Sequence, residues 1–490
     1  MAVELPQLTS ECTGLFIDGE WTPSDSTDRI SVSTPIDGSE LTSVPAGCNA
    51  DVDAAYEAAA AAQSEWASIT PDERAAVLAR FAERVDEHED ALVSTLAAES
   101  GSVTLKGSAE LDIARGFIDF AAALPHELHG TTGPASVPNK ENRIEREPAG
   151  VVGVISPWNF PFSLTIRAVA PAIALGNTVV IKPSSETPIT SGLCIAKLFE
   201  LAGAPAGVVN VVTGRGSDIG DRMASHPTAD VIAFTGSTGV GRRVSKLAAE
   251  QLTPQAMELG GNNPHVVLED ADVDMAVDAG VFGTYLHQGQ VCISLNRHLV
   301  HESIYDEYVR KLTERTETLP IGDPRDAETV IGPIINETER DELLEYVSRT
   351  EDAGARVETG GDAEGLYLEP TVLSGVHNDM AAACNEHFGP IAPVIPFGSD
   401  EEAIEIANDT EYGLAASVHS GDRRRAESVS RRIEAGMVHI NDQPINSNPR
   451  IPFGGRKDSG IGQFNGEAIV KKFTDPKWIS IQTEPRSYPF

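Results

Sequence analysis

The stretch Asp230-Val-Ile-Ala-Phe-Thr-Gly-Ser-Thr-Gly-Val-Gly241 decides the fold class, because it joins a short β-branched run to a glycine-rich turn and then to a helical segment from Arg242 onward. Similar runs precede it, separated by segments of helical character, at 151–156, 178–182 and 208–212. This alternation predicts a parallel α/β sheet. The turn can bind phosphate, because small residues let the backbone approach an anion and a helix N-terminus offers free amides. Its spacing is neither the G-x-G-x-x-G dinucleotide fingerprint nor a nucleotide P-loop.

The length and composition indicate a globular protein of several domains. A chain of 490 residues is too long for a single hydrophobic core. Its residues are 41% hydrophobic, yet no uninterrupted apolar run is long enough to predict a membrane span. The first fifteen residues lack the basic-then-apolar pattern of a secretory signal, so we expect a cytoplasmic protein. The five cysteines are scattered and odd in number, which predicts free thiols.

The charge balance is strongly acidic. Asp and Glu number 74 against 37 Lys and Arg, giving a formal net charge of −37 and a pI near 4.6. Nucleic acid is therefore not an expected partner. Self-repulsion at this charge destabilises a compact state unless salt screens it, so the composition favours a halophilic origin over an ordinary acidic enzyme.

Two local patterns concern the scaffold. Thr70, Pro71 and Glu73 form a predicted capping box that starts a helix within the helical region 49–101. The polar, proline-containing segment 130–147 predicts a protruding hairpin.

Cys292 is the candidate nucleophile. It follows Gly289-Gln-Val and lies between a helical stretch, Val277 to His287, and a strand-like run, His298 to His301. Such a boundary can present a thiol to a cleft. Taken alone, a cysteine is more often a small buried hydrophobic residue, so the interpretation depends on the rest of the chain.

Seven short motifs follow one another along the chain: Pro157-Trp158-Asn159-Phe160-Pro161, Lys182-Pro183-Ser184, Phe234-Thr-Gly-Ser-Thr238, Met257-Glu258-Leu259-Gly260-Gly261, Gly289-Gln290-Val291-Cys292, Glu386-His387-Phe388-Gly389-Pro390 and Pro452-Phe453-Gly454-Gly455. In these motifs and in their order, the chain resembles the NAD(P)-dependent aldehyde dehydrogenase superfamily over nearly its whole length.

The resemblance implies a covalent mechanism of aldehyde oxidation. Cys292 would attack the aldehyde, and the Asn159 amide with the Cys292 backbone N–H would bind the oxyanion. Glu258 would be the general base for thioester hydrolysis, because burial between Met257 and Leu259 would raise its pKa toward neutrality.

The resemblance also implies NAD or NADP as cofactor. Ser237 would hold the pyrophosphate, Lys182 the adenosine ribose and Glu386 the nicotinamide ribose, while Phe388 would flank the nicotinamide. Ser185 stands where many NAD-preferring relatives have a glutamate, which predicts that NADP is accepted. The other expected cofactor-binding residues are Ile155, Ser156, Trp158, Gly216 and Gly260.

The substrate is expected to be aromatic or apolar. Phe160, Phe162, Phe453 and Phe464 lie in or beside motifs that line the substrate funnel in this family. Four stretches look most like the benzaldehyde and vanillin dehydrogenase branch: Glu258-Leu-Gly-Gly-Asn-Asn-Pro-His265, Arg167-Ala-Val-Ala-Pro-Ala172, His439-Ile-Asn-Asp-Gln-Pro444 and Phe473-Thr-Asp-Pro-Lys-Trp478.

The domain organisation is expected to follow the family. A Rossmann-type parallel-sheet cofactor domain would comprise 1–129 and 148–259, and an α/β catalytic domain 260–442. A small β oligomerisation module, 130–147 with the tail 443–490, would assemble a homodimer or homotetramer through the edge-strand pattern Lys477 to Gln482. The histidines form no metal-ligand pattern, so no metal is expected.

Other functions remain open at this stage. A CoA-acylating aldehyde dehydrogenase would share the cysteine but would not need Glu258, and a semialdehyde dehydrogenase would differ in substrate. A cysteine hydrolase would pair Cys292 with His287, although that spacing points the two side chains apart on a helix. A catalytically silent binding or structural relative would not need Asn159, Glu258 and Cys292 together.

Overall fold

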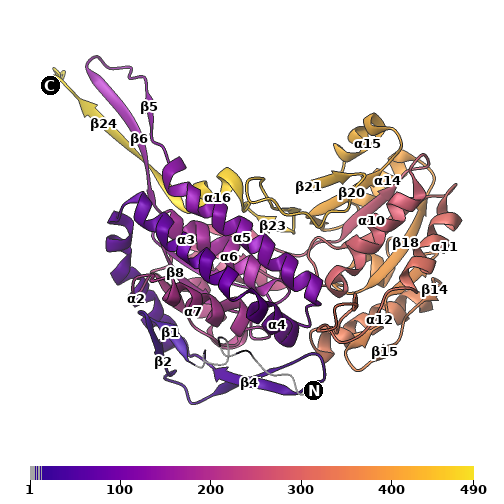
Figure 1. Ribbon diagram of the computed structural model, residues 1–490. Coiled ribbons are helices and arrows are strands. Elements are labelled where there is room, and N and C mark those ends of the chain that lie inside the picture. Colours follow the sequence, from indigo (N-terminus) through magenta and orange to yellow (C-terminus); the bar gives the residue numbers. More distant parts are fainter. Residues whose placement is uncertain (1–5, 7, 9–11, 13) are drawn as a thin grey trace.

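The computed structural model describes residues 6, 8, 12 and 14–490. Figure 1 shows two α/β bodies side by side, each built on its own sheet, with a β arm that projects from the first body. The first body is formed mainly by the N-terminal half of the chain and the second by residues that follow β11. Among the described residues, none of the helices combines the length and hydropathy needed to cross a membrane.

The first body contains an eight-stranded sheet. Its inner strands β9, β8, β7, β10 and β11 are parallel, and they include all four runs from which the sheet was predicted. Antiparallel β1 and β23 complete it, with β2 beyond β1. The strands are β1 (Leu15–Ile17), β2 (Glu20–Thr22), β7 (Val151–Ile155), β8 (Thr178–Lys182), β9 (Val209–Val211), β10 (Val231–Thr235), β11 (Gln255–Glu258) and β23 (Gly460–Ile461).

Helices pack around this sheet. The capping box predicted at Thr70 is confirmed: Glu73 N donates to Thr70 Oγ1 at 3.3 Å, and Thr70 N donates to Glu73 Oε2 at 2.8 Å. The helices are α2 (Asn49–Ser68), α3 (Pro71–Glu87), α4 (Glu89–Ser100), α5 (Thr104–Glu127), α6 (Pro161–Ala174), α7 (Cys194–Leu201), α8 (Gly216–Ser225) and α9 (Thr238–Glu250). A hairpin of β3 (Arg29–Ser33) and β4 (Glu40–Pro45) stands apart from the sheet.

The glycine-rich turn differs from its prediction in one respect. Helix α9 begins at Thr238 rather than at Arg242, so Gly239 and Gly241 lie inside the helix. A Cβ atom at Gly241 would collide with Leu259. That glycine therefore allows α9 to pack closely on the segment after β11, and it is not needed for a turn.

The second body contains a seven-stranded sheet in the order β14-β17-β18-β13-β12-β20-β21, parallel except for β14. Its strands are β12 (Asn263–Val267), β13 (Leu295–His301), β14 (Arg356–Thr359), β17 (Thr371–Ser374), β18 (Ile391–Phe397), β20 (Ala415–His419) and β21 (Met437–Ile440). Its helices are α10 (Val273–Tyr285), α11 (Tyr305–Thr316), α12 (Glu337–Asp352), α13 (Ala381–Cys384), α14 (Asp400–Asn408) and α15 (Arg423–Ser430).

The arm is a three-stranded sheet in the order β24-β6-β5 (Figure 1). The predicted hairpin forms from β5 (Thr131–Gly133) and β6 (Lys140–Pro148), and β24 (Thr474–Gln482) pairs with β6 along its length, as the pattern Lys477 to Gln482 predicted. Trp478 on the edge strand β24 is exposed. The rest of the tail returns to the bodies: β22 (Arg456–Lys457) pairs with β19 (Tyr412–Gly413), and Ile469 of α16 (Gly466–Lys472) joins the core of the first body.

Candidate active site

A cavity of about 710 Å³ lies at the carboxyl ends of the inner strands of the first sheet. In parallel α/β sheets this is the edge where ligands bind. The cavity brings together every residue predicted for catalysis or cofactor binding: Cys292, Glu258, Asn159, Ile155, Ser156, Trp158, Lys182, Ser185, Gly216, Ser237, Gly260, Glu386 and Phe388.

Cys292 is presented by a strained loop between α10 and β13. His287, Gln288 and Gly289 all adopt positive φ, at 51°, 57° and 73°. The side-chain amide of Gln288 donates to Pro333 O at 2.9 Å, and a Cβ atom at Gly289 would collide with the backbone of Gly389. Consecutive left-handed residues persist only where the surrounding structure enforces them, and such strain clusters at functional sites.

The Cys292 thiol is only partly exposed and is enclosed by protein. Burial raises its pKa to about 12; the positive charge of Arg167 opposes this shift, and the nearby carboxylates of Glu258 and Glu386 reinforce it. The thiol is therefore protonated at neutral pH in this arrangement. Before the sulfur can attack a carbonyl carbon, the thiol must lose its proton to an acceptor.

Glu258 is the carboxylate placed to take protons in this cavity. It ends β11 and is almost fully buried, and among the described residues neither of its oxygens has a hydrogen-bond partner. Burial raises its pKa to about 8, against the opposing charge of Arg167. A carboxylate with a pKa near neutrality and free oxygens can act as a general base.

Asn159 lies in the loop between β7 and α6. Its Nδ2 donates to Gln290 O at 2.9 Å, which ties the loop to the segment carrying Cys292 and leaves the second amide hydrogen for a ligand. The backbone oxygen of Asn159 accepts from Lys106 Nζ at 2.7 Å. Lys106 is in turn paired at 2.6 Å with Glu110, whose other oxygen accepts from Phe162 N at 2.9 Å at the start of α6.

Several lining groups fit a dinucleotide. The hydroxyl of Ser156 is buried and has no hydrogen-bond partner among the described residues. Ser237 precedes α9, and the first backbone amides of a helix lack partners within the helix and can bind an anion. Burial lowers the pKa of Lys182 to about 8, and its amine donates to Pro183 O at 2.8 Å. Burial raises the pKa of Glu386 to about 7, although Glu386 accepts from Gly261 N at 2.9 Å.

Comparison with known proteins agrees with this geometry. The family described as "Aldehyde dehydrogenase family" matches residues 21–479. The chain belongs to the aldehyde dehydrogenase family. It is 45% identical over 475 residues to a vanillin dehydrogenase of Corynebacterium glutamicum, covering 96% of this chain and 98% of that one. It is 43% identical to a benzaldehyde dehydrogenase of Bacillus subtilis, covering 97% and 98%. A solved betaine aldehyde dehydrogenase of Staphylococcus aureus in complex with NAD+ superposes with a TM-score of 0.95 at 32% identity, covering 99% of each chain.

The protein is thus an NAD(P)-dependent aldehyde dehydrogenase with the family's α/β fold. The groups described above suit a dinucleotide chemically: an anion site at the start of α9, an unpartnered hydroxyl at Ser156 and a carboxylate at Glu386. The part of the chain that the structure describes contains no group of three His, Cys, Asp or Glu residues placed to hold a metal ion.

The four phenylalanines that were expected to line the substrate funnel of this aldehyde dehydrogenase lie in different surroundings. Phe160 and Phe453 belong to the apolar cluster that adjoins Cys292. Phe162 and Phe464 are instead packed in the main core of the first body. Phe162 is a buried residue of α6, and both Phe464 and Phe453 lie against the guanidinium of Arg167. None of the four phenylalanines is among the residues that line the cavity. Phe160 and Phe453 share an apolar cluster with Cys292, whereas Phe162 and Phe464 do not.

Other residues lie at the site without having been predicted there. Leu164, Glu339, Glu342 and Tyr346 line the cavity, and Lys106, Glu110 and Arg167 lie behind it. Arg167 is the only charged residue in α6, which is otherwise apolar or small and neutral, and that isolation is a signal in the sequence. His287 is buried, lies edge-on to Phe160 and does not line the cavity, so it does not form a catalytic pair with Cys292.

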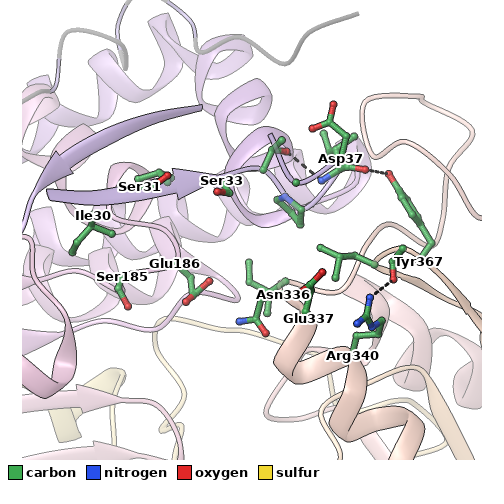
Figure 2. A pocket seen from close by; sticks show the side chains of 18 of the residues that line it. Ile30, Ser31, Ser33, Asp37, Ser185, Glu186, Asn336, Glu337, Arg340 and Tyr367 are labelled. Atoms are coloured by element: carbon green, nitrogen blue, oxygen red, sulfur yellow. Dashed lines mark hydrogen bonds between the residues drawn. The ribbon is translucent and has the colours of Figure 1, made fainter. Parts of the chain in front are cut away.

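A second, wider cavity of about 1470 Å³ lies between the β3–β4 hairpin and α12 (Figure 2). Tyr367 OH donates across it to Ile36 O of the hairpin at 3.2 Å, and Arg340 Nη1 donates to Gly365 O at 2.9 Å within the second body. It shares Ser185, Gly216 and Ser217 with the first cavity but contains none of the three candidate catalytic residues. The chemistry therefore belongs to the smaller cavity.

Proposed function

We propose that this aldehyde dehydrogenase oxidises aromatic aldehydes of the benzaldehyde and vanillin type to carboxylates. The observation that carries the proposal is the apolar cluster of Val291, Ile293, Leu414, Ala415 and Phe453, against which Cys292 and Phe160 pack. An apolar enclosure beside the nucleophile favours a ring over a short charged chain. The relatives named for vanillin and benzaldehyde cover nearly the whole chain, which supports the same substrate class.

Cys292 and Asn159 act in the first half of the reaction. The thiol of Cys292 releases its proton to water and the sulfur attacks the aldehyde carbon, which places negative charge on the former carbonyl oxygen. The free hydrogen of the Asn159 amide and the Cys292 backbone N–H stabilise that charge. When bound, NAD(P)+ supplies the acceptor for the hydride lost from the same carbon. A thioester on Cys292 then remains.

Glu258 acts in the second half. It takes a proton from a water molecule as the water oxygen adds to the thioester carbonyl. The C–S bond breaks, the carboxylic acid leaves, and Cys292 is regenerated as a thiol. In this proposal the cofactor is held and oriented by the lining residues Lys182, Ser185, Ser156, Ser237, Gly216, Ile155, Trp158, Gly260, Glu386 and Phe388.

The substrate proposal is tested by kcat/KM for benzaldehyde, vanillin and a short semialdehyde with a terminal carboxylate. We expect both aromatic aldehydes to be at least about tenfold better, because the apolar cluster beside Cys292 packs against a ring better than against a short charged chain. A semialdehyde far better than benzaldehyde would show that the substrate class is wrong.

The covalent roles are tested by intact mass after mixing with benzaldehyde and cofactor. Glu258→Gln is expected to accumulate a benzoyl adduct, and Cys292→Ala is expected to form none. Cys384→Ala removes an exposed cysteine and serves as the matched control that keeps wild-type behaviour. An adduct that survives in Cys292→Ala would assign the nucleophile elsewhere.

The remaining features of the proposal concern the cell and the assembly. We propose that residues 1–129 and 148–259 bind the cofactor, that 260–442 form the catalytic domain, and that the arm joins subunits into a homodimer or homotetramer. The exposed Trp478 on the edge strand β24 supports an arm that pairs with another subunit. We further propose that the enzyme is cytoplasmic. The net charge of −37 supports adaptation to high salt.

A further inference from the structure

Arg167 is a buried arginine with very few partners. It is 4% exposed on α6, and among the described residues its only hydrogen bond joins Nη2 to Thr235 Oγ1 at 3.3 Å. Its Nε has no partner within the same described part of the chain. Buried guanidinium groups are normally paired with carboxylates or several carbonyls, as Arg297 is elsewhere in this protein. The sparse bonding of Arg167 therefore needs a physical reason.

Two phenylalanine rings enclose the guanidinium. Its central carbon lies 4.8 Å from the ring centroid of Phe453 and 4.6 Å from that of Phe464. The two phenylalanines are held together by reciprocal backbone hydrogen bonds of 2.9 and 2.8 Å. Aromatic rings stabilise a desolvated cation through their electron-rich faces without taking its charge away. The two rings therefore pack on the guanidinium and stabilise it, but they do not neutralise its charge.

The charge acts on Glu258 and Cys292. Thr235, which accepts from Arg167, is the cross-strand neighbour of Glu258 in the pairing of β10 with β11. No ion pair within 4 Å links Arg167 to Glu258 in the described chain, and both Glu258 oxygens stay without partners. Burial raises the pKa of Glu258 and of Cys292, and the charge of Arg167 opposes the rise at both groups.

We propose that Arg167 is a positioning residue that supplies a fixed positive charge to Glu258 and Cys292, and that Phe453 and Phe464 keep it from closing a salt bridge. A direct bidentate pair would occupy the Glu258 oxygens, which must remain free to accept a proton. At a distance the same charge favours the ionised forms of both groups without blocking either. This inference rests on the proposed roles of Glu258 and Cys292.

The test uses Arg167→Met and Arg167→Gln, both neutral, and Arg167→Lys, which keeps the charge. Arg74→Met is the control, because Arg74 is also buried and binds the other end of α6 through Ala174 O at 3.0 Å. The first readout is the pH dependence of alkylation of Cys292 by iodoacetamide, assigned by peptide mass. The second is the pH dependence of acetyl-enzyme hydrolysis after acylation by p-nitrophenyl acetate, where the thiolate displaces p-nitrophenolate and water then releases acetate.

Neither readout needs an aldehyde or a cofactor, so a failed substrate proposal would not affect them. In the neutral variants we expect both profiles to move to higher pH by about one unit, which is the usual effect of removing an opposite charge nearby. Alkylation at a given pH below the thiol pKa would slow about tenfold, since the thiolate is the nucleophile. Arg167→Lys is expected to keep most of the wild-type profile.

The outcomes distinguish an electrostatic role of Arg167 from a role in packing α6 alone. If Arg167→Met does not fold, Arg167→Gln can keep the hydrogen bond to Thr235 and gives the same measurement. A folded neutral variant with wild-type profiles would overturn the inference. So would an equal shift in Arg74→Met, because that shift would follow from loosening α6 and not from the lost charge.

Discussion

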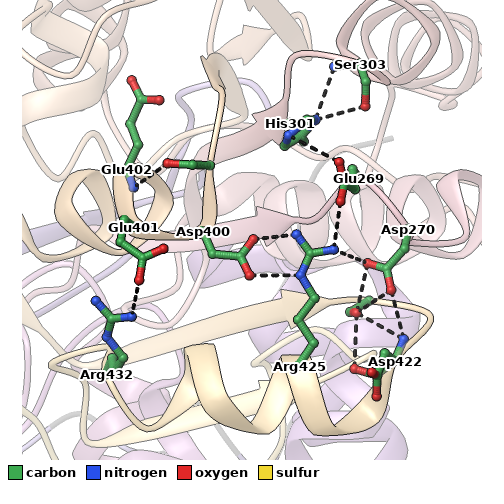
Figure 3. A network of polar contacts seen from close by, with 12 residues as sticks. Glu269, Asp270, His301, Ser303, Asp400, Glu401, Glu402, Asp422, Arg425 and Arg432 are labelled. Carbon is green, nitrogen blue, oxygen red and sulfur yellow. Dashed lines mark hydrogen bonds and ion pairs between the residues drawn. The ribbon is translucent and has the colours of Figure 1, made fainter.

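The charged side chains behind the active site differ from those around Arg425 in the second body both in their burial and in their pairing. Around Arg425, Asp400 accepts two hydrogen bonds, at 2.6 and 2.8 Å, and Glu269 and Asp270 lie at 3.1 and 3.4 Å (Figure 3). These side chains are 26–50% exposed. Behind the cavity, Lys106 and Glu110 are buried as a pair, whereas Arg167 and Glu258 are buried without a bond between them.

The contrast shows where charge stabilises the fold and where it acts in chemistry. Exposed pairs are solvated whether or not they are made, so each contributes little. A buried pair is strongly coupled to its surroundings because breaking it leaves a charge without water. Buried charges that stay unpaired retain the capacity to exchange protons or to influence groups that do. In this enzyme the unpaired charges lie at the thiol.

The largest expected effect comes from breaking the buried pair. Lys106→Met should lower the free energy of unfolding by about 3–5 kcal/mol, because Glu110 would be left buried without its partner. Arg425→Met, the matched change in the exposed network, should cost about 0.2–1 kcal/mol. Denaturant unfolding of both variants measures the difference. Equal losses would mean that burial does not distinguish the two regions.

Asn159→Ala should affect the reaction more than the fold. It removes the side-chain oxyanion donor while Lys106 still holds the Asn159 backbone oxygen. We expect kcat to fall by about 10²–10³, with a melting temperature close to that of the wild type. Steady-state kinetics and thermal unfolding of the same preparation test this. A variant with normal kcat would exclude the amide from the oxyanion site.

Salt should act on the two regions differently. Raising it from 0.01 M to 1 M shortens the Debye length from about 30 Å to about 3 Å. We expect the whole enzyme to gain activity and melting temperature, because self-repulsion at a net charge of −37 is screened. The cost of Arg425→Met should vanish in 1 M salt while that of Lys106→Met remains. Full activity and an unchanged melting temperature in dilute buffer would contradict the halophilic interpretation.

The smallest expected effect concerns cofactor choice at Ser185. Ser185→Glu should shift kcat/KM toward NAD, because a carboxylate there accepts from ribose hydroxyls and repels a 2′-phosphate. The wild type is expected to use both cofactors. The comparison is made at one high salt concentration, since screening weakens phosphate discrimination. A wild type that uses NAD but shows no detectable turnover with NADP would indicate that Glu186 or another residue excludes the phosphate.

Much of the site could be predicted from sequence because its residues are carried by short motifs. Asn159 follows β7, Lys182 ends β8 and Glu258 ends β11, and the carboxyl ends of these parallel strands meet at one edge of the sheet. Cys292 and Glu386 instead lie in loops that precede β13 and β18. Strand alternation placed Ile155 and Lys182 at the ends of predicted strands, whereas Glu258 was supplied by its motif. The motifs supplied Asn159 and Cys292.

The prediction was weaker where a contact joins distant segments. Phe464 lies in the tail, and nothing local indicates that it packs on Arg167 and not in a substrate funnel. The start of α9 was placed four residues late because Gly239 and Gly241 resemble turn glycines, although one of them serves packing against Leu259.

The sequence by itself determined the parallel strands and the capping box at Thr70, because each depends on neighbours within a few positions. Its family motifs also named the residues that meet in the cavity. Only the tertiary structure decided which charges are buried. Lys106 and Glu110 have the i, i+4 spacing of an ordinary surface pair. They form a buried ion pair because α5 packs against α6, and Lys106 there binds the backbone oxygen of Asn159. Desolvation depends on what covers a side chain. That covering comes from segments far away in the sequence, so it cannot be read from the residue or its neighbours.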